Sequence, residues 1–251
     1  MRLFLILWLC LAPPALGQDG ARFIAFSEGR YTDAVALAET EMSADALAFS
    51  ARSLLAEAMS VSDFDPPIEN VEAAEALARK ALEMDPSHIE GRLQLAIALS
   101  LRARPLSNRE ALRAGHGEEA KDLVDSVLRD DPENLYANGF LAVWHVEVRR
   151  RGGAIGASFM GASVKNGRVH YANAIAVDPG DASTHWQYAR ALCALNAKKY
   201  RNEIEQSLEA AITSRVDTEL ERIMKSRAQA LYDILRSENR RTAEARAKQM
   251  L

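Results

Sequence analysis

The sequence carries one Asp-Pro turn three times at a nearly constant spacing. The three prolines are Pro86, Pro132 and Pro179, which lie 46 and 47 residues apart. Each turn separates two segments rich in Ala and Leu, in "KALEMDPSHIEGRLQLAIAL", "DSVLRDDPENLYANGFLAVW" and "ANAIAVDPGDASTHWQYARAL". A period this regular, within a chain of 251 residues, indicates a repeat protein.

The residues around the three prolines share a pattern that predicts helical hairpins. Small residues that recur at one helical position let two helices approach closely, and large apolar residues beside them fill the groove. Proline separates the two helices because it has no backbone N–H to donate within a helix. Stacked hairpins bury together the apolar face that a single hairpin leaves exposed. The recurring positions are Leu95-Ala96, Leu141-Ala142 and Tyr188-Ala189 after the prolines, and Ala74, Ala120, Gly167, Ala81, Val127 and Ala174 before them.

This pattern resembles the tetratricopeptide repeat (TPR) family, W-x2-L-G-x2-Y followed by A-x3-F, then A and P. The Leu-Gly position matches the three pairs after the prolines, and A-x3-F matches Ala74-x3-Ala78, Ala120-x3-Val124 and Gly167-x3-Tyr171. The sequence departs from the family at the tryptophan position, which holds Arg92, Asn138 and His185. The period also exceeds the usual length of about 34 residues. The extra residues are "RARPLSNREALRAGHG" and "RRGGAIGASFMGAS", which we expect between the two helices of a hairpin.

The resemblance implies an all-α fold, a TPR-like α-solenoid of stacked helical hairpins with long inter-helix insertions. Frequent Ala, Leu, Arg and Glu favour helices as well. We expect one helical domain over residues 18–251. Its repeat units should cover roughly residues 23–59, 66–101, 118–149 and 164–214, with C-terminal capping helices over 217–251.

Residues 1–17, "MRLFLILWLCLAPPALG", have the pattern of a secretory signal peptide. One arginine precedes the apolar run Leu3–Ala12, and Ala15 and Gly17 stand at the −3 and −1 positions of a cleavage site. The run is shorter than the roughly 20 residues that a helix needs to cross a bilayer. The alternative to a cleaved signal peptide is an uncleaved anchor. We expect a mature chain that begins at Gln18, is periplasmic or secreted, and has no transmembrane segment.

No motif in the sequence indicates catalysis. The five histidines have no metal-ligand spacing, and Cys193 has the helical spacing of a small buried hydrophobe. The net charge of −4 is too mild to indicate nucleic acid, and no basic stripe with interleaved aromatic residues is present. We therefore expect a protein that is not an enzyme and has no cofactor, no metal site and no nucleic-acid partner.

The segment "RRRGGAIGASFMGASVKNGR" has the one unusual composition in the chain. Its spacing of Gly156 and Gly161 imitates a phosphate-binding loop, but Ala162-Ser163 stand where Lys-Ser/Thr is required and no strand precedes it. The segment is then an inter-helix insertion, flexible or closely packed. The run Arg149, Arg150 and Arg151 either pairs with an anionic ligand or is solvated at the end of a helix.

The concave wall is the other candidate site. In the TPR family, ligand contacts come from recurrent positions on the first helix of each hairpin, which here include Tyr136, Val143, Trp186 and Arg190. Family members that clamp a C-terminal carboxylate use Lys and Asn there, and apolar residues replace them in this chain. An apolar wall with two aromatic residues and one arginine suits a peptide segment or a lipophilic acid. The alternative is that these residues only pack the core.

Two functions remain after these exclusions. The first is an exported, non-enzymatic scaffold that holds a protein or peptide partner on its concave surface. The second is a periplasmic ligand carrier or accessory component of a TRAP-type transporter that binds a small lipophilic acid. The signal peptide and long insertions resemble the periplasmic TPR proteins associated with such transporters, and also the regulator of microtubule dynamics family.

The signal peptide gives the first testable prediction. N-terminal sequencing of the protein purified from its native host should begin at Gln18, and the product should fractionate as soluble outside the cytoplasm. A membrane-bound product that begins at Met1 would contradict the prediction and favour the uncleaved anchor.

Overall fold

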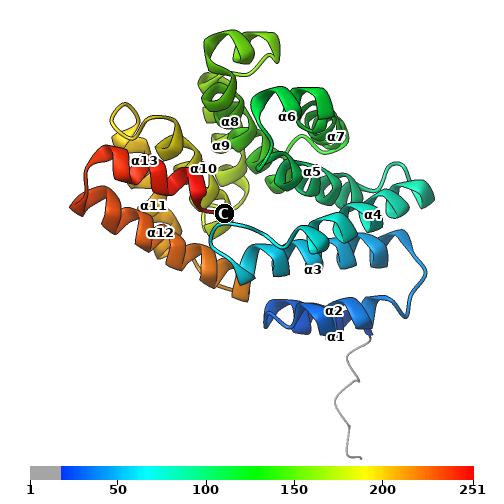
Figure 1. Ribbon diagram of the computed structural model, residues 1–251. Helices are drawn as coiled ribbons and strands as arrows, with labels where there is room; N and C mark the ends of the chain where they lie inside the picture. Colours follow the sequence, from blue (N-terminus) through cyan, green and yellow to red (C-terminus); the bar gives the residue numbers. More distant parts are fainter. Residues whose placement is uncertain (1–17) are drawn as a thin grey trace, which may run out of the picture.

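The computed structural model describes residues 18–251, and this part of the chain folds into thirteen α-helices without a strand (Figure 1). The predicted all-α class is confirmed, whereas the signal peptide lies outside the described residues. No helix in the described part is long and apolar enough to cross a membrane. The helices are α1 (Gln18–Ser27), α2 (Tyr31–Ala38), α3 (Ala44–Val61), α4 (Ile68–Met84), α5 (Ile89–Ala103), α6 (Asn108–Ala114), α7 (His116–Asp130), α8 (Leu135–Phe159), α9 (Val164–Val177), α10 (Ala182–Asn196), α11 (Arg201–Thr213), α12 (Glu219–Ser237) and α13 (Arg240–Gln249).

The three Asp-Pro turns begin their second helices with the same N-cap. Two residues after each proline stands a capping side chain, which accepts a hydrogen bond from the backbone N–H three residues further on. Each cap satisfies one of the N–H groups that a helix start leaves without an intrahelical partner. The caps are His88, Asn134 and Asp181, which begin α5, α8 and α10.

The departures at the TPR tryptophan position have a common structural role. Six residues after its proline, each side chain donates to that proline's carbonyl oxygen. The bonds run from Arg92 Nε to Pro86 O at 3.0 Å, from Asn138 Nδ2 to Pro132 O at 3.1 Å, and from His185 Nε2 to Pro179 O at 2.9 Å. Three different residue types therefore close the same turn, because each offers an N–H donor at the required place.

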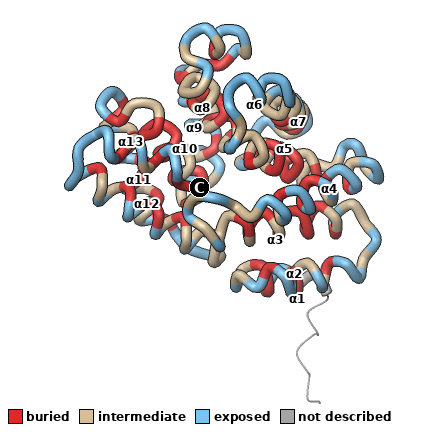
Figure 2. Tube along the Cα trace, viewed as in Figure 1, coloured by how far each residue is buried: buried red, intermediate tan, exposed pale blue. Residues whose placement is uncertain are grey.

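Small residues bring the paired helices together, as the repeat alignment predicts. Ala74, Ala120 and Ala174 are completely buried. At Gly167 a Cβ atom would stand 3.0 Å from Ala142 O, so a side chain there would crowd the backbone of α8. Figure 2 shows the buried residues along the faces where neighbouring helices meet.

The two long insertions lie within hairpins and are themselves helical. The first contains α6, whose N-terminus carries a capping box of Ser107 and Glu110 between α5 and α7. The second is the last part of α8, which is interrupted at Gly153 with φ 64° and ψ −158°. A positive φ is a conformation that glycine adopts without steric cost.

The C-terminal helices curl back toward the N-terminal hairpins and close the curve of the solenoid. Arg227 of α12 is 3% exposed and reaches the end of α3. Its Nε pairs with Asp63 Oδ1 at 2.9 Å, and its Nη2 donates to the carbonyl oxygens of Met59 and Ser62. The backbone N–H of Leu251 donates to Asp63 O at 2.9 Å. Segments more than 160 positions apart in the sequence therefore meet on one side of the molecule.

The close helix contacts generate a stability prediction with matched controls. Ala74→Leu and Ala174→Leu should overpack buried contacts and lower stability by roughly 1–3 kcal/mol. Ala73→Leu and Ala172→Leu enlarge exposed positions of the same two helices and should change little. Thermal melts followed by circular dichroism measure the difference, at about 2–4 °C per kcal/mol for a chain of this size. Equal melting temperatures for buried and exposed variants would contradict the packing.

Candidate functional site

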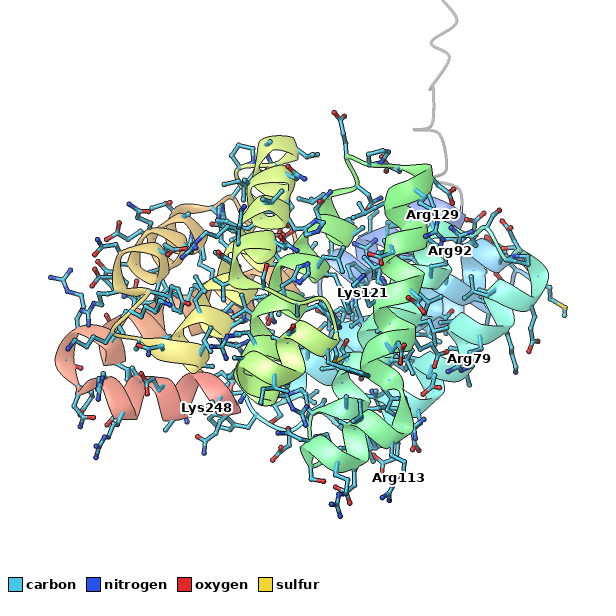
Figure 3. All side chains as sticks on the ribbon, turned by 90° about the horizontal axis from the view of Figure 1, so that it is seen from above. Arg79, Arg92, Arg113, Lys121, Arg129 and Lys248 are labelled. Carbon is cyan, nitrogen blue, oxygen red and sulfur yellow. The ribbon has the colours of Figure 1, made fainter. Side chains whose placement is uncertain are left out.

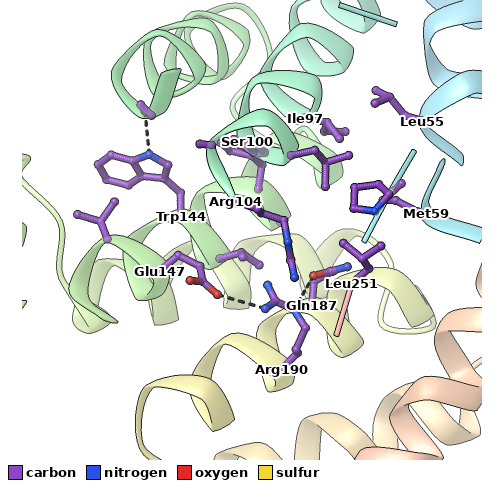
Figure 4. A pocket seen from close by; sticks show the side chains of 18 of the residues that line it. Leu55, Met59, Ile97, Ser100, Arg104, Trp144, Glu147, Gln187, Arg190 and Leu251 are labelled. Carbon is purple, nitrogen blue, oxygen red and sulfur yellow. Dashed lines mark hydrogen bonds and ion pairs between the residues drawn. The ribbon is translucent and has the colours of Figure 1, made fainter. Parts of the chain in front are cut away.

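The concave side of the solenoid holds a large cleft of about 1460 Å³, here called the central cleft (Figure 4). Its walls come from α3, α5, α8, α10 and α12, and both insertions and the C-terminal segment contribute to it. Apolar side chains form most of the lining, among them Leu55, Met59, Ile97, Leu101, Phe140, Val143, Trp144 and Met224. The central cleft is thus a mainly apolar surface enclosed by helices far apart in the sequence.

The two insertions meet beside the central cleft. Arg151 joins them: its Nη1 and Nη2 donate to the carbonyl oxygens of Ala103 and Leu106, and Asn108 Nδ2 donates to Arg151 O. The insertions carry large apolar side chains that line the cleft and are exposed. Leu112 of α6 is 62% exposed, and Ile155 and Phe159 at the end of α8 are 87% and 81% exposed. We call Leu112, Ile155 and Phe159 the apolar rim.

A charged cluster lies within the same lining. Glu147 accepts from Arg190 Nη1 at 3.2 Å through one oxygen and from Arg150 at 2.7 Å through the other. Burial alone would raise the pKa of Glu147, but the positive charges of Arg190 and Arg150 outweigh burial and hold that pKa below its usual value. The Glu147 side chain is therefore ionised at neutral pH, with both oxygens occupied.

Arg104 approaches the same cluster from the end of α5 (Figure 4). Its Nη2 donates to the carbonyl oxygens of Gln249 and Met250, at 3.1 and 3.0 Å. Among the described residues Arg104 has no ion pair. Burial, together with repulsion from Arg190, lowers the pKa of Arg104 to about 10. The guanidinium remains charged at neutral pH, but its surroundings do not compensate it fully.

The structure separates the residues predicted for the concave wall. Tyr136, half exposed, and Val143 line the central cleft, as does the Arg190 guanidinium. Trp186 does not: its side chain is completely buried, and its Nε1 donates to Leu251 O at 2.8 Å. Trp186 faces the C-terminal segment that packs on α10. At this position the side chain packs in the core and does not form part of the cleft wall.

The predicted arginine run is also divided among different roles. Arg150 pairs with Glu147 inside the cleft, and Arg151 ties the two insertions together. Arg149 is partly buried and does not contribute to the lining. Only Arg150 of the three therefore belongs to the charged cluster, and the run does not form one anion site.

The sequence pattern missed Arg104 and Trp144. Arg104 lies in the first insertion, where the repeat alignment offers no position to compare. Trp144 is adjacent to the predicted wall residue Val143, and its Nε1 donates to Gly117 O at 2.9 Å while its ring lines the cleft. The aromatic residue itself was the available signal, but the family offsets selected its neighbour.

The environments of His145 and Cys193 indicate structural roles for these side chains. His145 accepts from the backbone N–H of Ser163, and burial lowers its pKa to about 4, which keeps the ring neutral. Cys193 is completely buried, as expected, and burial raises the pKa of its thiol to about 12. Within residues 18–251 no group of three or more His, Cys, Asp or Glu side chains is placed to hold a metal ion.

Basic side chains on the outer surface are largely neutralised by neighbours. Figure 3 shows Arg79, Arg92, Lys121 and Arg129 spread over α4, α5 and α7. Arg79 pairs with Glu119, Arg92 with Asp130, and Lys121 with Asp125, so opposite charges are interspersed there. Such exposed pairs contribute little to stability, with a median near 0–1 kcal/mol.

Comparison with known proteins supports the fold. No family model matches the chain, and no curated protein matches it. Among solved structures, it is similar to the crystal structure of a thermophilic TPR protein from Thermus thermophilus, with a TM-score of 0.56 and 17% sequence identity. The similarity covers 85% of this chain and 96% of that one. The chain therefore has a TPR-like helical-repeat fold, as the sequence predicts.

The charged cluster generates a pH-dependent prediction. Glu147→Gln should destabilise the protein by about 1.5–3 kcal/mol at pH 7, because it replaces charged hydrogen bonds to Arg190 and Arg150. The pKa of Glu147 is lowered in the folded state. The difference in the free energy of unfolding between the two proteins, here called the gap, should therefore be full above pH 4.5 and become smaller as the pH falls further.

Urea unfolding of both proteins at several pH values measures this gap. Glu83→Gln, at an exposed position near the end of α4, is the control and should show no comparable gap. A Glu147→Gln gap that stays constant down to pH 3 would mean that the carboxylate is not ionised in this cluster.

Proposed function

We propose that the protein is an exported, non-enzymatic binding protein whose central cleft holds an apolar segment of a protein or peptide partner. The observation that carries this proposal is the continuity of the apolar rim with an apolar cleft. Large exposed apolar surfaces bordered by polar residues mark interaction sites in soluble proteins. Leu112, Ile155 and Phe159 line the cleft and are each more than half exposed.

The size of the central cleft favours a partner larger than a typical metabolite. Its volume of about 1460 Å³ exceeds the roughly 300–1,000 Å³ of ordinary small-molecule pockets. An extended or helical peptide could place several apolar side chains along α3, α5 and α8. Tyr136 and Gln187 would offer polar contacts to the peptide backbone from the same walls.

The second candidate is a ligand carrier or accessory component of a TRAP-type transporter, which would bind a small lipophilic acid. One specific observation favours it: the guanidinium groups of Arg104 and Arg190 lie within the apolar cleft. An anionic head beside an apolar wall is the ligand chemistry that this arrangement complements. Export, in either form, rests on the predicted signal peptide.

Selection of peptides from a display library on the immobilised protein tests the first candidate. Enriched peptides should be rich in Leu and Phe, and fluorescence anisotropy should show specific binding. Phe159→Glu should weaken that binding about tenfold or more, because it puts a charge into the apolar rim.

Met42→Glu is the matched control for this experiment. Met42 is 95% exposed and does not line the cleft, so the same change there should leave affinity unaltered. The peptide-binding proposal fails if no peptide is enriched, or if Phe159→Glu and Met42→Glu have equal effects.

A further inference from the structure

The charged cluster of the central cleft has more positive than negative charge. Its members are Arg104, Arg150, Arg190 and Glu147, three guanidinium groups and one carboxylate. The two oxygens of Glu147 are occupied by Arg190 and Arg150. The cluster therefore holds an excess positive charge beside apolar walls, where the low polarity of the surroundings strengthens attraction to an anion.

Arg104 is the member that pairs with no carboxylate of the described residues and leaves two of its three nitrogens without an acceptor. Only its Nη2 donates to the protein, to two carbonyl oxygens of the C-terminal segment. Its Nε and Nη1 have no acceptor among the described residues, and neither is among the fully buried atoms that lack a partner. These donors are thus accessible from the cleft.

The fully buried arginines of the described chain each pair with a carboxylate. Arg227 pairs with Asp63, and Arg190, whose side chain is 5% exposed, pairs with Glu147. Arg151 lacks one but satisfies its guanidinium with two carbonyl oxygens and the Asn108 side chain. Arg104 differs because it is partly buried, forms no ion pair with a described residue and keeps two donors without an acceptor.

The apolar surroundings of Arg104 fit a hydrocarbon chain. Figure 4 shows Arg104 and Arg190 reaching toward each other from α5 and α10, with Gln187 beside them. Leu55 and Met59 of α3 lie on the side of Arg104 away from Trp144. A head group held between the two arginines would leave an attached chain against these side chains.

We propose that Arg104 and Arg190 together bind the carboxylate of an aliphatic carboxylic acid, whose chain lies along the apolar wall formed by α3 and α5. The inference rests on the carrier form of the proposed function. Charge-assisted hydrogen bonds from guanidinium N–H groups to carboxylate oxygens are stronger than those between neutral groups. Arg104 supplies the open donors, and Arg190 adds its charge while it remains anchored by Glu147.

Isothermal titration calorimetry with dodecanoic acid and 1-dodecanol as probes tests the proposal on the full protein. The two probes share a chain and differ in the head group. The wild-type protein should bind the acid about tenfold or more tightly than the alcohol. Arg104→Gln should remove that preference, and Arg104→Lys should restore part of it by restoring the charge without the planar fork.

Arg104 is the preferred site for the variant because it has no ion pair to break, and circular dichroism should show an intact fold. Arg129→Gln is the matched control, an exposed arginine at the end of α7 outside the cleft. It should keep the wild-type preference for the acid. Dodecyl phosphate is a third probe, and preferential binding of it would overturn the assignment to a carboxylate.

The remaining outcomes separate this inference from the function on which it rests. If acid and alcohol bind equally and Arg104→Gln changes neither, the cleft binds aliphatic chains but the two-arginine site is wrong. If neither probe binds, the carrier form fails, and the inference fails with it. Either result leaves the peptide-binding proposal to its own experiment.

Discussion

The hydrogen bonds of Arg227 to the end of α3 join distant parts of the solenoid, and the enclosure of the central cleft depends on that contact. A solenoid of stacked hairpins is open by construction, because each repeat contacts only its neighbours. Here one nearly buried guanidinium occupies Asp63 and two carbonyl oxygens of the distant α3 segment. The contact brings α12 and the C-terminal segment across the concave side. The central cleft is therefore enclosed by these C-terminal segments as well as by the hairpins.

The charges inside this enclosure cost stability. Transfer of guanidinium and carboxylate groups out of water is unfavourable, and apolar replacements of buried ion pairs are often neutral or stabilising. The pairing of Glu147 with Arg190 and Arg150 offsets part of that cost, but Arg104 adds a positive charge that forms no ion pair with a described carboxylate. A packing role explains the ion-paired members. Arg104 also holds the C-terminal segment through the carbonyl oxygens of Gln249 and Met250, and the carboxylate of a ligand would supply the ion pair that it lacks.

The local chemistry of the turns made much of the fold predictable from the sequence. Proline spacing located the hairpins, and small residues such as Ala74, Ala174 and Gly167 marked the helix contacts because side-chain size limits how closely helices approach. The site was less predictable because it depends on contacts between distant segments. Trp186 occupies a wall position in its repeat but is covered by the C-terminal segment. Arg104 lies in an insertion that no repeat position describes.

The location of α6 and of the last part of α8 separates the stacking of the hairpins from the apolar rim that could contact a ligand. Both segments join helices within a hairpin and project from the stack, so their length does not set the distance between successive hairpins. Most buried contacts therefore lie in the other helices, whereas the apolar rim lies in these two segments, where Ala157 packs against Trp144. Replacement of these two segments, in evolution or by design, could alter the ligand preference while the packing between hairpins is kept.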